Sequence, residues 1–111
     1  MEEKYELQCN ACDHIVCVKV GKVRRENLYE MTRKYWVMNL ERASRATHVC
    51  AVINGIVEAV YIPSKWFHSN EPGHEGRCMF IGTEEVASDY IGKCVNSYYG
   101  HSSNPVRYIN L

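Results

Sequence analysis

The chain has 111 residues, of which 46% are hydrophobic and 23% are charged. These values are typical of one globular domain over residues 1–111; they exclude a disordered or fibrous chain and leave little room for a second domain. Thirteen basic and thirteen acidic residues give a formal net charge of zero. This balance excludes the strong positive charge of many sequence-independent DNA-binding proteins, but it leaves a local basic patch open.

No targeting or membrane segment is expected. Residues 1–10 are charged and lack the apolar stretch of a signal peptide, and no run approaches the roughly 20 apolar residues of a membrane-spanning helix. We therefore expect a cytoplasmic protein that is not inserted in a membrane. The chain has six cysteines, an even number that would suit a disulfide framework in a secreted protein. Three of them lie in apolar runs, where a thiol acts as a small hydrophobic group.

The first half of the chain predicts a strand and two short helices. His14–Val20 is rich in β-branched residues, which favours a strand that ends at Gly21. Residues 27–36 carry apolar side chains three and four positions apart, which predicts a helix capped by Asn27. Asn39 is placed to cap a second short helix over residues 39–46.

A tight hairpin follows at Asn54-Gly55, because this dipeptide tolerates the positive φ angles of a type I′ turn. The returning strand, residues 56–62, alternates so that one face is apolar and the other carries a single carboxylate, Glu58. Pro63 is expected to end this strand and turn the chain outward, because proline has no backbone N–H to donate. Trp66 would then lie at the rim of the domain.

The second half predicts further strands and a third helix. Residues 68–76 and 98–104 are expected to be loops, 77–82 a strand, and 105–111 a final strand. Residues 83–90 are expected to form a short helix, with Thr83 as its cap and two carboxylates in its first turn. The order of elements predicts an α+β fold, a mixed β-barrel of five to six strands with two or three short helices.

The search for catalytic and metal-binding motifs gives no catalytic residue. Cys9, Cys12, His14 and Cys17 could supply zinc ligands, but all four would come from one short stretch, and mobile surface thiols are the alternative. Neither a nucleophilic serine elbow nor a glycine-rich phosphate loop is present. We therefore expect a non-catalytic chain without a metal or cofactor.

Aromatic residues are the remaining signal. Trp36, Trp66 and Phe80 fall at the ends of expected elements, and rings of this kind can stack an unpaired base. Two interpretations stay open: the rings plug the ends of a small barrel, or they line a ligand slot. In the second, Trp36 and Trp66 meet at one opening, Asn39 reads the edge of the base and Arg33 contacts its phosphate.

The chain also resembles known families. It contains the segments LYEMTRKYWVMNLERASRATHVCAVINGIVEAVYIPSKW, RCMFIG, YIGKCV and NPVRYINL, which look like those of a small bacterial family. More loosely, a tryptophan, a capped helix and the hairpin AVINGIV resemble the PUA-like superfamily of β-barrels, with its EVE, ASCH and YTH branches. The resemblance implies a barrel that binds RNA or DNA, recognises a modified or flipped base, and works beside a protein partner such as a nuclease component.

Carried over to this sequence, the resemblance implies an aromatic cage and two phosphate contacts. The cage residues would be Trp36, Asn39, Trp66 and Phe80, and the phosphate contacts would be Arg33 and Arg42. The alternative is a protein-interaction or regulatory module that uses the same cleft, or the loop Tyr98–His101, for a peptide or a partner protein.

Overall fold

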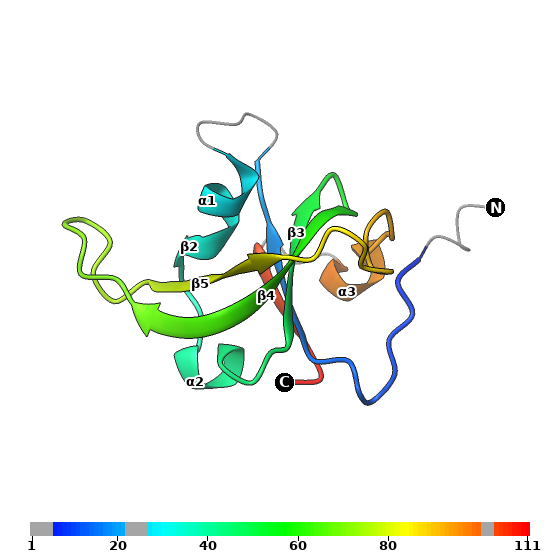
Figure 1. The fold of residues 1–111 in the computed structure, drawn as a ribbon, viewed down its shortest axis with the longest axis horizontal. Helices are drawn as coiled ribbons and strands as arrows, with labels where there is room; N and C mark the ends of the chain where they lie inside the picture. The colour runs from blue at the N-terminus through cyan, green and yellow to red at the C-terminus, as the bar shows by residue number, and fades with distance from the viewer. Residues whose placement is uncertain (1–5, 22–26, 101–103) are drawn as a thin grey trace.

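A computed structural model of the chain describes residues 6–21, 27–100 and 104–111. Within these residues a curled, mixed sheet of six strands forms a half-barrel, accompanied by three short helices (Figure 1). The elements in chain order are β1 (Ile15–Lys19), α1 (Leu28–Arg33), β2 (Lys34–Trp36), α2 (Leu40–Ala43), β3 (His48–Ile53), β4 (Ile56–His68), β5 (Cys78–Glu84), α3 (Asn96–Tyr99) and β6 (Val106–Ile109). The expected α+β, barrel-like class is confirmed at this level.

The predicted hairpin lies at the centre of the sheet. The strand order is β2-β5-β4-β3-β1-β6, in which β1 and β3 run parallel and the other pairs are antiparallel. β3 and β4 are joined at Asn54 and Gly55, whose φ angles of 56° and 79° are those of a left-handed turn. This part of the prediction is confirmed.

Two apolar cores cover the two faces of the sheet. The inner face packs against α1 and α2 and is built from Val16, Val18, Val20, Ala43, Ala46, Val49, Ala51, Ala59, Tyr61, Phe80 and Val106. The outer face packs against α3 and is built from Leu7, Ile15, Cys17, Cys50, Val52, Val57, Val60, Val95, Tyr99 and Ile109. Alternate residues of β1 and β3 serve opposite faces, as period-2 side-chain geometry requires.

The strict alternation expected for residues 56–62 is interrupted. Ala51 is opposite Ala59, but the next pair is Val52 with Val57, so the register shifts at a β-bulge around Glu58. Val57 and Val60 therefore both contribute to the outer core, although the sequence assigned them to opposite faces. Glu58 is exposed within this bulge.

The helix caps predicted at Asn27 and Asn39 are confirmed. The side-chain oxygen of Asn27 accepts a hydrogen bond from the N–H of Glu30 at 2.9 Å, and that of Asn39 accepts from the N–H of Arg42 at 2.9 Å. The first helix is shorter than expected, because the chain enters β2 at Lys34. Trp36 therefore lies on a strand instead of ending a helix.

The expectation that Pro63 ends its strand is wrong. β4 continues to His68 and pairs with β5 along this length, with Pro63 opposite Gly82 and Trp66 opposite Phe80. The register shifts between Pro63 and Lys65, which accommodates the missing proline N–H at an irregular position of the ladder. Residues 63–81, here called the arm, extend to one end of the molecule (Figure 1).

The third helix lies elsewhere than predicted. Thr83 and Glu84 belong to β5, opposite Ile62 and Tyr61, and turns follow them. Sheet pairing thus overrides the local capping signal at Thr83. The helix α3 forms instead at Asn96–Tyr99, partly within a stretch that the sequence assigned to a loop. Among the described residues, no helix is long and apolar enough to cross a membrane.

Candidate functional site

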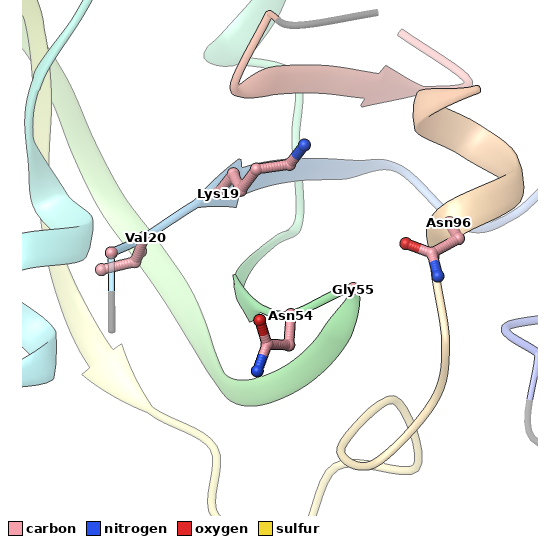
Figure 2. A pocket seen from close by; sticks show the side chains of 6 residues that line it. Lys19, Val20, Asn54, Gly55 and Asn96 are labelled. Carbon is pink, nitrogen blue, oxygen red and sulfur yellow. The ribbon is translucent and has the colours of Figure 1, made fainter. Parts of the chain in front are cut away.

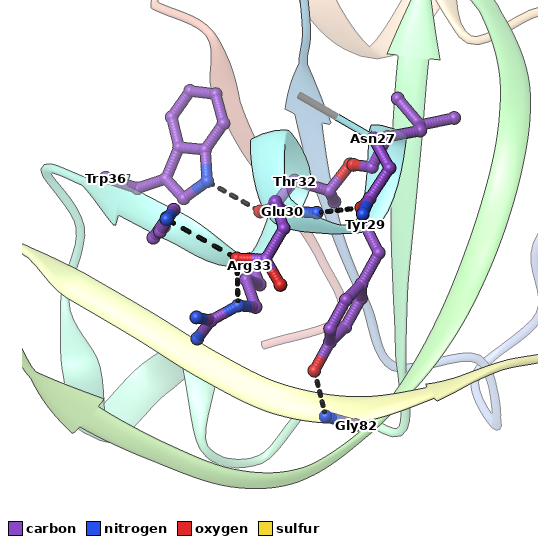
Figure 3. A network of polar contacts seen from close by, with 9 residues as sticks. Asn27, Tyr29, Glu30, Thr32, Arg33, Trp36 and Gly82 are labelled. Carbon is purple, nitrogen blue, oxygen red and sulfur yellow. Dashed lines mark hydrogen bonds and ion pairs between the residues drawn. The ribbon is translucent and has the colours of Figure 1, made fainter. Parts of the chain in front are cut away.

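Trp36 is held by the first helix and lies over the inner core. Its indole N–H donates a hydrogen bond to the carbonyl of Thr32 at 2.7 Å (Figure 3). Beside it, Glu30 accepts from Arg33 Nε at 2.9 Å and lies 3.4 Å from Lys34 Nζ. Burial acts to raise the pKa of Glu30, but these two cations outweigh it and the pKa is lowered.

Trp66 and Phe80 face each other across β4 and β5, with ring centroids 4.9 Å apart. Phe80 has no exposed surface, so its ring belongs to the core and is not accessible to a base. Trp66 is partly buried, and its indole nitrogen is enclosed without a hydrogen-bond partner among the described residues. Both tryptophans pack on the inner core, on strands that flank β5 on either side.

Asn39 and Arg42 close the half-barrel. The backbone N–H of Asn39 donates to the Tyr108 hydroxyl at 2.9 Å. Arg42 Nε donates to the carbonyl of Leu111 at 2.7 Å, and its guanidinium lies 4.2 Å from the centre of the Tyr108 ring. These contacts connect the segment that follows β2 with β6 and with Leu111. β2 and β6 are the two outermost strands of the sheet. The residues expected to bind a base edge and a phosphate are thus engaged in holding the domain together.

Arg33, by contrast, lies at a hollow of about 490 Å³ at the base of the arm, here called the arm pocket. It is lined by Arg33, Lys34, Tyr35, Phe67, His68, Ser69, Asn70, Glu71 and Met79. Lys34, Met79 and Phe67 are opposite one another on β2, β5 and β4, so they share one face of the sheet. A cation, a thioether and an aromatic ring therefore form adjacent parts of its wall.

An aromatic stack lies at the edge of the arm pocket. The rings of Tyr35 and His74 are parallel within 2°, and their centroids are 4.1 Å apart. Lys34 Nζ lies 5.4 Å from the Tyr35 ring, and Lys65 Nζ lies 5.9 Å from the Phe67 ring. Cations close to partly exposed rings are a combination that suits phosphates and bases.

A second hollow, of about 610 Å³, lies at the tip of the β3–β4 hairpin (Figure 2). It is lined by Lys19, Val20, Gly21, Asn54, Gly55 and Asn96. The Asn96 amide lies so close to Gly55 that any Cβ at that position would collide with it, so glycine is required by space as well as by its positive φ. Lys19 is the single cation of this lining, which contains no aromatic ring.

A third hollow, of about 320 Å³, is acidic and contains a histidine. His48 Nε2 lies 3.3 Å from Glu85 Oε1, and the Tyr90 hydroxyl donates to Asp13 at 2.6 Å. The hydrogen bonds from Tyr90 and from the N–H of Asn10 lower the pKa of Asp13. Burial and the bond to Asp13 raise the pKa of Tyr90. Three carboxylates, Asp13, Glu85 and Asp89, make this hollow a poor site for a phosphate.

The cysteines are free thiols. Cys17 is buried in β1 opposite Cys50 of β3, and the hydrogen bond that the Cys50 thiol donates to Cys17, together with burial, raises the pKa of Cys50. Burial also raises the pKa of Cys9, so neither thiol is activated as a nucleophile. Among the described residues, no three histidine, cysteine or acidic side chains are grouped so that they could hold a metal ion.

The loop proposed as an alternative protein-binding surface is engaged internally where it is described. The Tyr98 hydroxyl donates to the Leu7 carbonyl at 3.2 Å, and the Tyr99 hydroxyl donates to the Pro105 carbonyl at 3.0 Å. Tyr99 is buried. His101 lies outside the described residues.

Sequence reasoning did not identify Tyr35, Phe67 or His74 as site residues. Tyr35 lies in a basic and aromatic run, residues 33–36, which is a signal in the sequence. Phe67 and His74 come close to Tyr35 only because β4 extends beyond Pro63. No family model, curated protein or solved structure matches this chain. The functional assignment therefore rests on the geometry of the site.

Proposed function

We propose that this chain is a non-catalytic nucleic-acid-binding module of PUA-like architecture, which takes RNA or DNA at the arm pocket. The observation that carries the proposal is the combination of cations, rings and an amide around one hollow of about 490 Å³. A protein that binds a nucleic-acid strand needs cations for the phosphates, aromatic faces for the bases and polar groups for the base edges. Arg33 and Lys34, Tyr35 and Phe67, and Asn70 supply these three kinds of group.

The zero net charge of the chain is compatible with this proposal as weak binding, because cations and carboxylates lie together around the arm pocket. Lys65 and Arg77 are exposed on the arm, which also carries the exposed carboxylates Glu71 and Glu75. Asp13 and Glu85 line the acidic hollow, and the segment after β5 lies at the end of the molecule away from the arm (Figure 1). At the arm and its base, four cations (Arg33, Lys34, Lys65 and Arg77) are countered by three carboxylates (Glu30, Glu71 and Glu75), an excess of one positive charge. We therefore expect weak, salt-dependent binding.

The proposal keeps the function expected from the sequence but moves its site. Trp36, Trp66 and Phe80 pack on the inner core, and Asn39 and Arg42 hold the half-barrel closed. Of the expected binding residues, Arg33 lines the arm pocket. A base flipped out of a duplex would use the same rings as a base of a single strand, and a nuclease component as protein partner stays a prediction.

Fluorescence anisotropy of labelled single-stranded RNA and DNA tests the proposal. We expect binding that weakens as salt is added. Lys65→Ala should lower both the affinity and the salt dependence, because each phosphate contact contributes roughly 0.7 to 0.9 to the slope of the logarithm of the binding constant against the logarithm of the salt concentration. The matched control is Lys19→Ala, which removes an exposed lysine at the second hollow and should change neither quantity. Equal effects of both substitutions, or no binding by the unmodified chain, would contradict the proposal.

A further inference from the structure

The face of Tyr35 that would receive a base is covered by a ring of the same chain. His74 stacks on Tyr35 with a centroid distance of 4.1 Å and an interplanar angle of 2°. An offset or parallel stack at this spacing is the geometry that a nucleic-acid base adopts on a tyrosine. The imidazole is itself a flat nitrogen heterocycle, so it occupies the place of a base.

His74 is held in its loop by backbone hydrogen bonds. Its N–H donates to the Glu71 carbonyl at 2.9 Å, and its carbonyl accepts from the N–H of Arg77 at 3.2 Å. The ring contact with Tyr35 is the side-chain interaction that the structure records for His74 within the described residues. Residues 71–77 are all exposed. The imidazole can therefore leave Tyr35 without uncovering the hydrophobic core.

Tyr35, in contrast, is fixed to the domain. It lies between Lys34 and Trp36 of β2, which are opposite Met79 and Cys78 of β5, and it is partly buried. The register of this pair shifts between Lys34 and Trp36, so Tyr35 occupies an irregular position at the outermost strand. One member of the stack is thus anchored in the sheet, and the other belongs to an exposed loop.

We infer that the ligand of the arm pocket is an unpaired base that stacks on Tyr35 in the place of His74. The inference rests on the proposed function and specifies it: single-stranded nucleic acid is bound, and His74 competes with it. Bases within a duplex have both faces covered by their neighbours, so they cannot take this place without being flipped out. Lys34 lies close enough to the Tyr35 ring to contact a phosphate beside the base, and Lys65 lies close to the Phe67 ring of the same pocket.

Three variants and two probes test the inference. The probes are a labelled oligothymidylate of about ten nucleotides and an abasic strand of the same length, which has the phosphates but no bases. We expect His74→Ala to bind the oligothymidylate about threefold to tenfold more tightly than the unmodified chain, and Tyr35→Ala to bind it about tenfold less tightly. His74→Phe retains a competing ring and should stay close to the unmodified chain. The abasic strand should bind all of them equally, and thermal unfolding of each variant confirms that it is folded.

The outcomes separate this inference from the proposed function. If His74→Ala weakens binding of the oligothymidylate or leaves it unchanged, His74 does not compete and the inference is overturned, while nucleic-acid binding stands. If the abasic strand responds to the substitutions as the oligothymidylate does, the rings do not stack a base, and the inference again fails. If neither probe binds the unmodified chain or any variant, both proposals are wrong.

Discussion

The indole of Trp66 makes one favourable and one unfavourable contribution to the stability of the fold. Its ring packs on Phe80 and on the inner core, while its N–H is enclosed without an acceptor among the described residues. Burying apolar area stabilises the fold, whereas an unsatisfied donor costs about 1 to 3 kcal/mol. Trp36 differs in this respect, because its N–H donates to Thr32. The two tryptophans, which look alike in the sequence, therefore have different energetic roles.

Substitutions of Trp66 distinguish a packed ring from a rim residue. We expect Trp66→Ala to lower the free energy of unfolding by about 3 kcal/mol, because it leaves a cavity beside Phe80. Trp66→Phe should change it by less than about 1 kcal/mol, because the lost area is offset by removal of the unpaired N–H. Urea denaturation measures both values. An unchanged stability of Trp66→Ala would show that the ring lies free at the surface.

Among single elements, those with local signals were predicted well. The caps at Asn27 and Asn39 depend on an N–H three residues away, and the hairpin depends on two adjacent residues. The arm could not be predicted, because the continuation of β4 beyond Pro63 depends on pairing with β5, whose partner residues lie from ten (His68 with Cys78) to nineteen (Pro63 with Gly82) positions along the chain. For the same reason Thr83, a good cap in isolation, is part of a strand.

The Tyr108 hydroxyl is one of the contacts that connect the two outermost strands. Tyr108→Phe removes the acceptor of the Asn39 N–H but keeps the ring under Arg42. We expect a loss of about 1 kcal/mol in the free energy of unfolding, with faster hydrogen exchange at the Asn39 amide. Tyr98→Phe, the matched control, removes a hydroxyl that bonds to Leu7 near the outer core, and it should leave exchange at Asn39 unchanged. Unaltered exchange in Tyr108→Phe would mean that this contact does not hold the closure.

At the scale of the whole molecule, the sites are assembled from segments that are distant in the sequence. The arm pocket combines β2 with the far end of β4, and the acidic hollow combines the segment before β1, the start of β3 and the turns after β5. Arg33 could be singled out from its basic neighbourhood, but its association with Phe67 depends on the sheet order. Long-range pairing of this kind has no local sequence signature, so the candidate site was predicted only in part.

The contact between Asp13 and Tyr90 links two such segments and makes stability depend on pH. Hydrogen bonds from Tyr90 and Asn10 lower the pKa of Asp13 in the folded chain, so the unfolded chain binds the proton more readily. The stabilisation is therefore fully present above about pH 4, the ordinary range of an aspartate, and it is lost as the pH falls through the lowered pKa.

Tyr90→Phe removes the first of these hydrogen bonds and tests this linkage. Because Asp13 is largely solvated, we expect a loss of only about 1 kcal/mol in the free energy of unfolding near neutral pH, and this difference should disappear as the pH falls through the lowered pKa of Asp13. Urea denaturation at several pH values measures the two curves. Tyr98→Phe is the control, because its hydroxyl bonds to the neutral carbonyl of Leu7. The free energy of unfolding of Tyr98→Phe should therefore differ from that of the unmodified chain by the same amount at each of these acidic and neutral pH values. A Tyr90→Phe curve that ran parallel to that of the unmodified chain down to low pH would show that the tyrosine does not stabilise the ionised form of Asp13.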